Sequence, residues 1–243
     1  MKESPGKIEA AMNGSPPKIE IALFAAGFAM AGLVLLALVW SGAGAYVDMA
    51  RAQGITSATF IDHTTGQSVG LDLASVAEEH RLWSTYVTGG TEGPPPPGRF
   101  YTADEISHMS DVRRVFDGAK ILIPAGLFVM AIRLQRARAR SAAAMLHLVR
   151  AGAIAAGVVV AAIGVIAAFA FEQAFLLFHE VFFPQGNFLF DPATSNLVRL
   201  YPDWYWQGIT FRVGLSFIAL AATVAAAATV GLRRARSTRL ADA

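Results

Sequence analysis

Residues 146–171 read LHLVRAGAIAAGVVVAAIGVIAAFAF, a run in which almost every side chain is apolar. At about 1.5 Å of rise per residue, a helix of this length covers the roughly 30 Å hydrocarbon core of a bilayer. Three further apolar stretches, residues 19–40, 120–134 and 209–232, are also candidates for spans, although the second is short. The sequence therefore predicts an all-α membrane protein with four transmembrane helices.

The composition agrees with a membrane protein and excludes several kinds of chemistry. Of the 243 residues, 54% are hydrophobic, and the mean hydropathy is +0.46, which is more than a soluble domain needs to fill its core. The chain has no cysteine, so disulfides, thiolate metal ligands and a cysteine nucleophile are excluded. Nothing in the sequence indicates a cofactor or a nucleic-acid site.

The distribution of basic residues predicts the orientation. Twelve of the 20 Lys and Arg residues flank the spans at one set of ends, before the first, between the second and third, and after the fourth. By the positive-inside rule, these ends and both termini are cytoplasmic. The connections 41–119 and 172–208 then form a small mixed extracytoplasmic cap.

The expected domain organisation follows from this topology. Residues 1–18 form a disordered cytoplasmic tail, residues 19–232 form the four-span domain with its two outer loops, and residues 233–243 form a second cytoplasmic tail. The tripeptide at residues 43–45, Ala-Gly-Ala, resembles a signal-peptidase site. We expect the first span to be retained, because its apolar run is longer than the core of a typical signal peptide.

Local patterns predict the elements of the cap. Residues 57–62 and 67–73 are expected to pair as a hairpin, and a helix is expected from about Ser75 to residue 87. Thr102 and Glu105 form a capping box, which predicts a helix to about residue 116. We expect Gly118 to break this helix before the second span.

Two histidines stand where apolar helices leave the membrane. On the helix after Thr102, His108 has Glu105 and Asp111 three residues to either side, so both carboxylates lie beside the imidazole. Glu172 and His179 are seven residues apart, which places them on one face of a helix. An ionisable side chain at such a position is a functional candidate by default.

The residues after His179 form a break and a polar loop. Pro184-Gln185-Gly186 interrupts the helix, and Asn187 and Arg199 follow before the aromatic cluster at residues 204–206. We interpret His108 and His179 as a shared active site. The alternative is that each is an interfacial histidine that stays hydrated.

Two other readings of the histidines have less support. His179-Glu180 begins like a zinc-protease motif, but the position of the second helical ligand is Phe183. No Gly-x-Ser-x-Gly elbow is present to support a serine triad. The sequence therefore predicts no bound metal, and the arginine clusters are read as topology signals.

Two segments resemble the lipoprotein intramolecular transacylases, a bacterial four-span family. The matching positions are Tyr101-Thr102-x-x-Glu105-Ile106-Ser107-His108-Met109-x-Asp111-Val112-Arg113, Phe178-His179-Glu180-x-Phe182-Phe183-Pro184-x-Gly186-Asn187, Phe190-Asp191-Pro192 and Leu197-Val198-Arg199-Leu200-Tyr201-Pro202. Phe188 is a departure, because members of the family usually have tryptophan there.

The resemblance implies an activity and a location. Family enzymes move the sn-2 acyl chain of a diacylglyceryl-modified lipoprotein onto the amino group of its lipidated N-terminal cysteine. Two histidines carry this reaction, and His108 and His179 are the matching positions. The resemblance implies a multi-pass protein of the bacterial plasma membrane, acting at the extracytoplasmic face on lipoproteins among membrane lipids.

The chemistry of the transfer suits this chain, because the nucleophile is the substrate's own amine. We expect His108 to act as the base, flanked by Glu105 or Asp111, and His179 to be its partner in proton transfer, although the two roles can be exchanged. Asn187 and Arg199 are expected to contact the acyl carbonyl oxygen. The alternatives are a non-enzymatic four-span scaffold with a partner-binding outer domain, and a metal-dependent lipid hydrolase.

Overall fold

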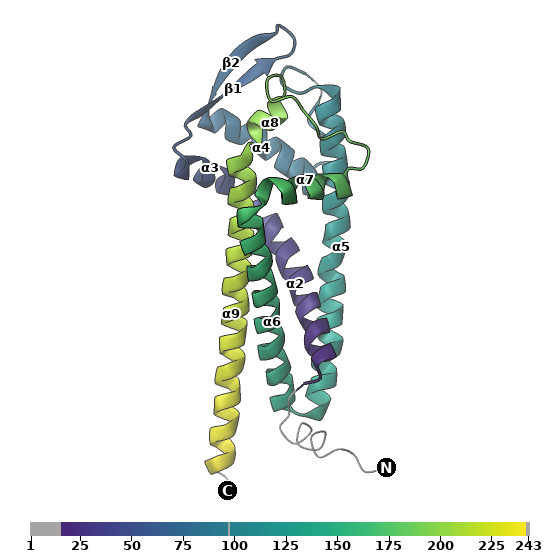
Figure 1. The fold of residues 1–243 in the computed structure, drawn as a ribbon, viewed down its shortest axis with the longest axis vertical. Helices are drawn as coiled ribbons and strands as arrows, with labels where there is room; N and C mark the ends of the chain where they lie inside the picture. The colour runs from purple at the N-terminus through teal and green to yellow at the C-terminus, as the bar shows by residue number, and fades with distance from the viewer. Residues whose placement is uncertain (1–15, 97, 242–243) are drawn as a thin grey trace. The chain divides into compact units, whose positions relative to one another are not determined.

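The computed structural model describes residues 16–96 and 98–241, so most of the predicted tail over residues 1–18 lies outside the described residues. Within them, four helices are long and apolar enough to cross a membrane. These are α2 (Lys18–Trp40), α5 (Ala103–Arg140), α6 (Ala142–Phe169) and α9 (Asp203–Ala241), shown in Figure 1. Each predicted span lies on a separate helix, which confirms the four-helix prediction.

Two details of the long helices differ from the sequence prediction. Helix α5 continues without interruption from Ala103 to Arg140, so the expected break at Gly118 is wrong. A glycine inside a helix costs only about 1 kcal/mol relative to alanine, and Lys120 anchors the next turn by donating to Asp117 Oδ1 and to the carbonyl oxygen of Thr88. The third span ends at Phe169, because the chain leaves helical geometry at Ala170.

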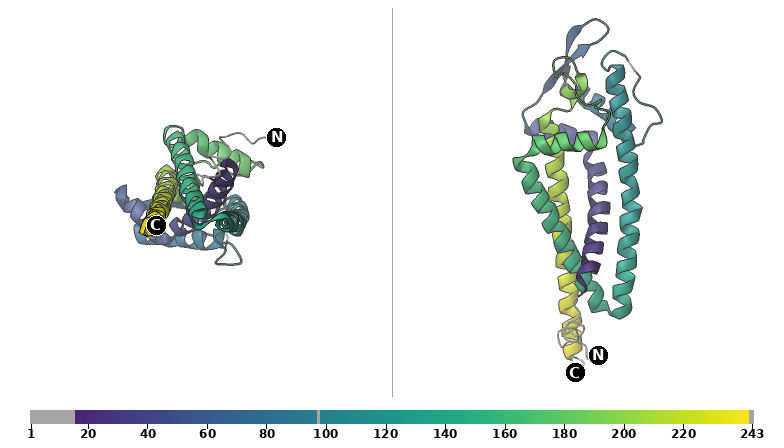
Figure 2. Two further views of the ribbon diagram at one scale, coloured as in Figure 1. Left: turned by 90° about the horizontal axis from the view of Figure 1, so that it is seen from below. Right: turned by 45° about the vertical axis from the view of Figure 1, so that its right-hand side comes forward.

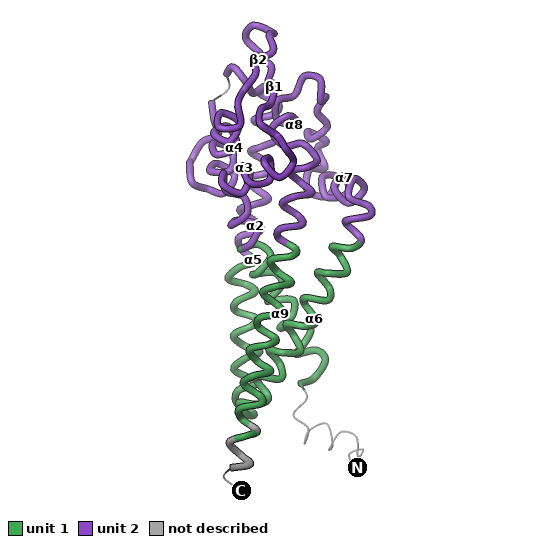
Figure 3. The backbone as a smooth tube through the Cα atoms, turned by 90° about the vertical axis from the view of Figure 1, so that its left-hand side faces the viewer, with its two compact units in different colours: residues 1–35, 122–165, 214–243 green, residues 36–121, 166–213 purple. Residues whose placement is uncertain are grey.

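The chain divides into two compact units, coloured separately in Figure 3. Unit 1 comprises residues 1–35, 122–165 and 214–243. In this unit, segments of the four long helices run side by side, as both views of Figure 2 show. Its buried cluster is formed by Phe24, Ala137 and Leu148, while side chains such as Phe128 point outward, as expected for a surface that faces lipid.

Helices α2 and α5 approach each other closely in unit 1 through a pair of glycines. A Cβ atom on Gly126 would lie 2.4 Å from the carbonyl oxygen of Gly27, and one on Gly27 would lie 2.8 Å from the carbonyl oxygen of Gly126. No side chain fits at either position without separating the helices. Small residues at such crossings allow helix backbones to meet in the membrane.

Unit 2 comprises residues 36–121 and 166–213. It contains α3 (Ala43–Ala52), the strands β1 (Ser57–Asp62) and β2 (Gln67–Asp72), α4 (Leu73–Val87), α7 (Phe171–Phe182) and α8 (Asn196–Leu200). The strands pair antiparallel from Ser57 with Asp72 to Asp62 with Gln67, so the predicted hairpin is confirmed. Helix α4 begins at Leu73, slightly earlier than expected, because the Asp72 side chain accepts a hydrogen bond from the Ser75 amide at 2.8 Å.

The two chain segments of unit 2 are joined by buried polar contacts. The Asn196 side chain bonds to both the amide and the carbonyl of Ile61, and also to the carbonyl of Phe100, each at 2.7 Å. The Tyr46 hydroxyl donates to the Leu200 carbonyl at 2.9 Å. The same segments share one buried core, whose largest members are Trp83, Tyr46 and Phe60.

Candidate active site

His108 lies on the second turn of α5, and a capping box sets the start of that helix. The Glu105 carboxylate accepts from the Thr102 amide at 2.8 Å, and the Thr102 hydroxyl accepts from the Glu105 amide at 3.2 Å. This reciprocal pair satisfies amides that a helix start otherwise leaves unpaired. The His108 side chain, one turn further on, is only 6% exposed.

His179 lies on α7, where its Nδ1 atom is 2.8 Å from the carbonyl oxygen of Phe175. A carbonyl oxygen can only accept, so Nδ1 must carry the proton of the neutral imidazole. The lone pair of the neutral ring is then on Nε2. The backbone of α7 therefore fixes which nitrogen of His179 is able to accept a proton.

The two imidazoles face each other. Their ring centroids are 6.2 Å apart, and their planes are inclined by 19°. Both rings belong to unit 2, although 71 positions separate them in the chain. The sequence interpretation that these histidines form one site agrees with their placement, while their catalytic role stays a prediction.

Phenylalanine side chains surround the pair. Phe183 and Phe190 lie 4.8 and 5.6 Å from the His108 ring, measured between centroids. Phe175 and Phe188 lie 4.1 and 5.1 Å from the His179 ring. These contacts remove most of the water that would otherwise solvate a charged imidazole, so the site favours neutral histidines.

The protonation of both histidines follows from this burial. Burial lowers the pKa of His179. For His108, which precedes the apolar part of α5, burial and the neighbouring His179 charge lower the pKa to about 4, while a hydrogen bond with Asn187 and the Asp111 charge act in the opposite direction. Both rings are therefore neutral near pH 7, which is the form that accepts a proton.

Asp111 does not bond to His108 but holds the loop that covers it. Its Oδ2 atom accepts from Gln185 Nε2 at 2.8 Å and from Asn187 Nδ2 at 2.7 Å. Its Oδ1 atom accepts from the exposed Arg114. The carboxylate thus fastens the turn after α7 to α5 and brings Asn187 to His108.

Glu105 was expected to flank His108, but its hydrogen bonds lead elsewhere. The side chain is 1% exposed, and Oε1 accepts from the Ser195 hydroxyl at 2.6 Å and the Leu197 amide at 2.8 Å. Oε2 is bound by Thr102. Glu105 therefore joins the start of α5 to the start of α8.

The structure places the two remaining predicted residues apart from the histidine contacts. Arg199 donates from its terminal nitrogens to the backbone carbonyls of Thr59 and Ala193, both at 2.8 Å. Glu172 is exposed in the first turn of α7, and it makes no hydrogen bond or ion pair with any residue that the structure describes.

Gln185 is a site residue that sequence reasoning missed. In the sequence, Gln185 belongs only to the predicted break at Pro184-Gln185-Gly186, where Gly186 adopts a φ of +77°. The bond from Gln185 to Asp111 spans 74 positions of the chain. No local sequence pattern predicts a contact between residues so far apart in the chain, so only the turn could be predicted.

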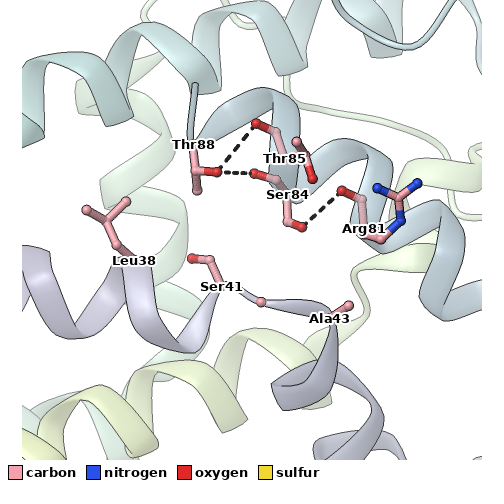
Figure 4. Close-up of a pocket in the computed structure, with 8 residues that line it drawn as sticks. Leu38, Ser41, Ala43, Arg81, Ser84, Thr85 and Thr88 are labelled. Carbon is pink, nitrogen blue, oxygen red and sulfur yellow. Dashed lines mark hydrogen bonds between the residues drawn. The ribbon is translucent and has the colours of Figure 1, made fainter. Parts of the chain in front are cut away.

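Other polar groups of unit 2 do not join the site. Within residues 16–96 and 98–241, no group of three or more His, Cys, Asp or Glu side chains could hold a metal ion. His80 bonds instead to Ser41 and Tyr201 in the core. A cavity of ≈ 240 Å³ is lined by Ser41, Ser84 and Thr88, among others, and includes none of the predicted site residues. Its lining is drawn in Figure 4.

The fold and the site define an integral membrane protein with four long apolar helices. Its unit 2 contains a buried pair of neutral histidines. Residues 52–206 match the family model described as lipoprotein intramolecular transacylase Lit. The chain belongs to this family of acyltransferases.

Solved structures show the same fold. The membrane-integral lipoprotein intramolecular transacylase Lit from Bacillus cereus aligns with a TM-score of 0.69 and 14% identity, covering 90% of this chain and 97% of that one. A variant of the Bacillus cereus protein with a histidine replaced by arginine aligns with a TM-score of 0.66 and 14% identity, covering 96% and 99% of the two chains. No curated protein sequence matches at a significant level.

Proposed function

We propose that this chain moves the sn-2 acyl chain of a diacylglyceryl lipoprotein to the amino group of the lipoprotein's N-terminal lipidated cysteine. The observation that carries the proposal is the facing pair of buried imidazoles, 6.2 Å apart between centroids. The substrate would supply both the nucleophile and the leaving group, so a chain without cysteine or a serine elbow is sufficient. Only proton transfer and orientation are required of the protein.

In the proposed reaction, the amine nitrogen attacks the ester carbonyl carbon as His108 removes the amine proton. His108 passes this proton to Nε2 of His179. The tetrahedral intermediate then collapses, the bond to the glyceryl oxygen breaks, and His179 gives the same proton to that oxygen, so both imidazoles end neutral. The products are an amide and a free sn-2 hydroxyl, with no net change in protons. The two histidines can exchange roles, and each proton transfer is worth about 10² to 10⁴ in rate.

A neutral imidazole is needed for the first step, and burial provides it. The lowered pKa values of both histidines make the uncharged form dominant at neutral pH. An α-amino group has a pKa of about 7.7 to 8.0, so a neutral imidazole can take its proton as the new bond forms. Holding amine and ester together would supply a further part of the rate enhancement.

Asn187 is the residue we assign to the carbonyl oxygen as it gains charge. One hydrogen of its side-chain amide is used by Asp111, which leaves the other for the substrate. We assign Arg199 to support of the site, because its two terminal nitrogens already donate to backbone carbonyls. Glu105 and Asp111 would act by positioning α8 and the loop around Asn187, and Glu172 keeps no assigned role.

The membrane orientation is also part of the proposal. The basic clusters favour cytoplasmic termini, which would put the histidine pair of unit 2 at the extracytoplasmic face of the plasma membrane. Lipoproteins present their lipidated cysteine at that face. The acyl chains of the substrate would remain among the apolar helices and membrane lipids.

The test is expression in a bacterium unable to N-acylate lipoproteins, followed by mass spectrometry of N-terminal lipopeptides. We expect the wild-type chain to convert diacyl lipopeptides to the N-acylated lyso form, and His108→Ala and His179→Ala to abolish conversion. His63→Ala, in the turn after β1, is the matched control and should retain activity. Membranes treated with a chelator should remain active.

The outcomes separate the alternatives. An unchanged diacyl form with the wild-type chain would contradict transacylation and favour the non-enzymatic scaffold. Product that persists in both His108→Ala and His179→Ala would contradict the site assignment. Loss of activity on chelation would support the metal-dependent alternative instead.

A further inference from the structure

Helix α7 presents three different sides. One side carries His179, the buried residue of the helix. Another carries Gln173 and Glu180, which are exposed and seven residues apart. The third carries an apolar stripe, which we define as Ala174, Leu177, Phe178 and Val181; these residues follow the i, i+3, i+4, i+7 spacing of one helix face.

The apolar stripe is not covered by any part of the chain that the structure describes. Leu177 is 60% exposed and Val181 is 64% exposed, and Phe178 is also exposed. Contiguous apolar surface of this kind indicates contact with a partner or a membrane. The polar side of the same helix shows that α7 is amphipathic and is not simply an extension of a span.

The chain adjacent to α7 identifies what covers the stripe. Helix α6 is a candidate span that ends at Phe169, and α7 begins at Phe171. Only Ala170 lies between them, and one residue extends the chain by at most about 3.6 Å. Helix α7 must therefore begin at the depth where α6 reaches the edge of the hydrocarbon core.

The exposed apolar surface also continues from one helix to the other within unit 2. Phe169, in the last turn of α6, is 90% exposed, and Ile166 one turn earlier is exposed as well. These side chains belong to a helix that crosses the bilayer, so their environment is lipid. The stripe extends this lipid-facing surface onto α7.

We infer that α7 is an interfacial helix whose apolar stripe lies among the acyl chains of the bilayer lipids, with Gln173 and Glu180 toward the headgroups and water. Amphipathic helices bind membrane surfaces in this manner, with the apolar face at the boundary of headgroups and acyl chains. The occupant of the stripe is membrane lipid, not a second copy of the chain.

This placement has a consequence for the substrate that rests on the proposed function. His179 is on the same helix as the stripe, so its imidazole is held within one helix diameter of the acyl chains. A lipid ester would reach it laterally from the bilayer, without first leaving the membrane. The lipoprotein substrate would be bound with its acyl chains still embedded.

The absence of cysteine from the sequence makes the placement directly testable. Single cysteines at Leu177, Val181 and Glu180 would be nitroxide-labelled in the full-length protein and reconstituted into phosphatidylcholine and phosphatidylglycerol vesicles. Ile163→Cys on span α6 provides the lipid reference, and Gln67→Cys in the hairpin provides the water reference. Oxygen and a water-soluble nickel chelate would be compared as relaxing agents.

We expect labels at Leu177 and Val181 to behave as the label at Ile163 does, with high collision with oxygen and little with nickel. The label at Glu180 should shift toward the Gln67 reference. Nickel accessibility at Leu177 and Val181 equal to that at Gln67 would overturn the inference. Spin–spin broadening at these positions that disappears on dilution with unlabelled protein would also overturn it, in favour of a second copy.

The measurement involves no turnover. A lipid-buried stripe in a chain that fails to convert diacyl lipopeptides would contradict the proposed function alone. A water-exposed stripe in an active chain would contradict the interfacial helix alone.

Discussion

Asn187 donates a hydrogen bond to Asp111 Oδ2 at 2.7 Å across 76 positions of the chain. This contact, with the parallel one from Gln185, fixes the turn after α7 against the helix that carries His108. Asp111, which the sequence predicts beside the His108 imidazole, therefore binds the loop that contains Gln185 and Asn187.

Replacing Asp111 by asparagine should loosen this turn. A hydrogen bond to a charged group is worth about 1.5 to 3 kcal/mol, and losing half of that in the transition state corresponds to a fall in kcat/KM of about 4- to 13-fold. The measurement is the initial rate with a synthetic diacyl lipopeptide in vesicles. Arg114→Gln is the control, because it removes only the exposed partner of the same carboxylate and should stay near the wild-type rate.

The protonation of the histidines predicts a low titration midpoint. Histidine NMR resonances of the full chain, which has five histidines, should show His108 titrating near pH 4 and His179 below the ordinary value of 6.5. Direct titration is needed because the substrate amine is protonated below about pH 8. The rate therefore already falls at pH values where the histidines are still neutral, and a pH–rate profile would not resolve their pKa values. A midpoint for His108 at or above 6.5 would contradict the burial argument.

The same shifts set a direction for stability. Below about pH 6.5 the unfolded chain binds protons at these histidines that the folded chain does not. The free energy of unfolding should therefore fall as the pH decreases from about 6.5 toward 4. His108→Gln, which removes one of these groups, should make that decrease shallower in thermal unfolding followed by tryptophan fluorescence.

Glu105→Gln should reduce stability without altering the chemistry. The buried carboxylate accepts from Thr102, Ser195 and Leu197, and an amide in its place turns one acceptor into a donor facing other donors. We expect a loss of about 1 to 3 kcal/mol, seen as a lower melting temperature. Asp104→Asn, at the exposed neighbouring position, should leave the melting temperature unchanged.

The distinguishing readout for Glu105 is the histidine titration. If Glu105 acts only by joining α5 to α8, the titration midpoint of His108 should be the same in Glu105→Gln and in the wild type. A midpoint that moves by a full unit would instead make Glu105 an electrostatic partner of the imidazole.

Substitutions at Phe188 test how closely the phenylalanine side chains must pack around the histidine pair. Its ring lies 5.1 Å from His179, and truncation to alanine should admit water and lower the rate. Truncation of a fully buried phenylalanine typically lowers the free energy of unfolding by about 3 to 5 kcal/mol. Because Phe188 is half-buried, we expect Phe188→Ala to lower it by about 1 to 2 kcal/mol. Phe188→Trp should keep activity within roughly tenfold, and Leu189→Ala, at an exposed neighbour, should have no effect on lipopeptide conversion.

The parts of the fold that were predictable are those set by local patterns. The four long helices follow from apolar length, and the hairpin follows from alternation and a turn between residues 62 and 67. The capping box at Thr102 and Glu105 was also readable, because its residues are three apart. The pairing of His108 with His179 was inferred from their similar positions at the ends of apolar helices.

The remaining features depend on contacts that no local pattern specifies. Ala170 interrupts a helix although alanine is the best helix former, and its φ of −134° and ψ of 44° lie outside the helical region. Besides their neighbours Arg114 and Thr102, Asp111 and Glu105 bind partners that lie 74 or more positions away. Arg199 was expected to face a substrate, but the backbone of β1 and of the turn before α8 binds its guanidinium.

Unit 2 is assembled from residues 36–121 and 166–213, and this arrangement fixes the order of events during synthesis. The segment with His108 leaves the ribosome before α6, whereas His179, Asn187 and Asn196 follow it. During translation, the first segment must wait with its core face uncovered until the third span has been inserted. The shared core of unit 2 therefore cannot close until α6 and the segment that follows it have been synthesised.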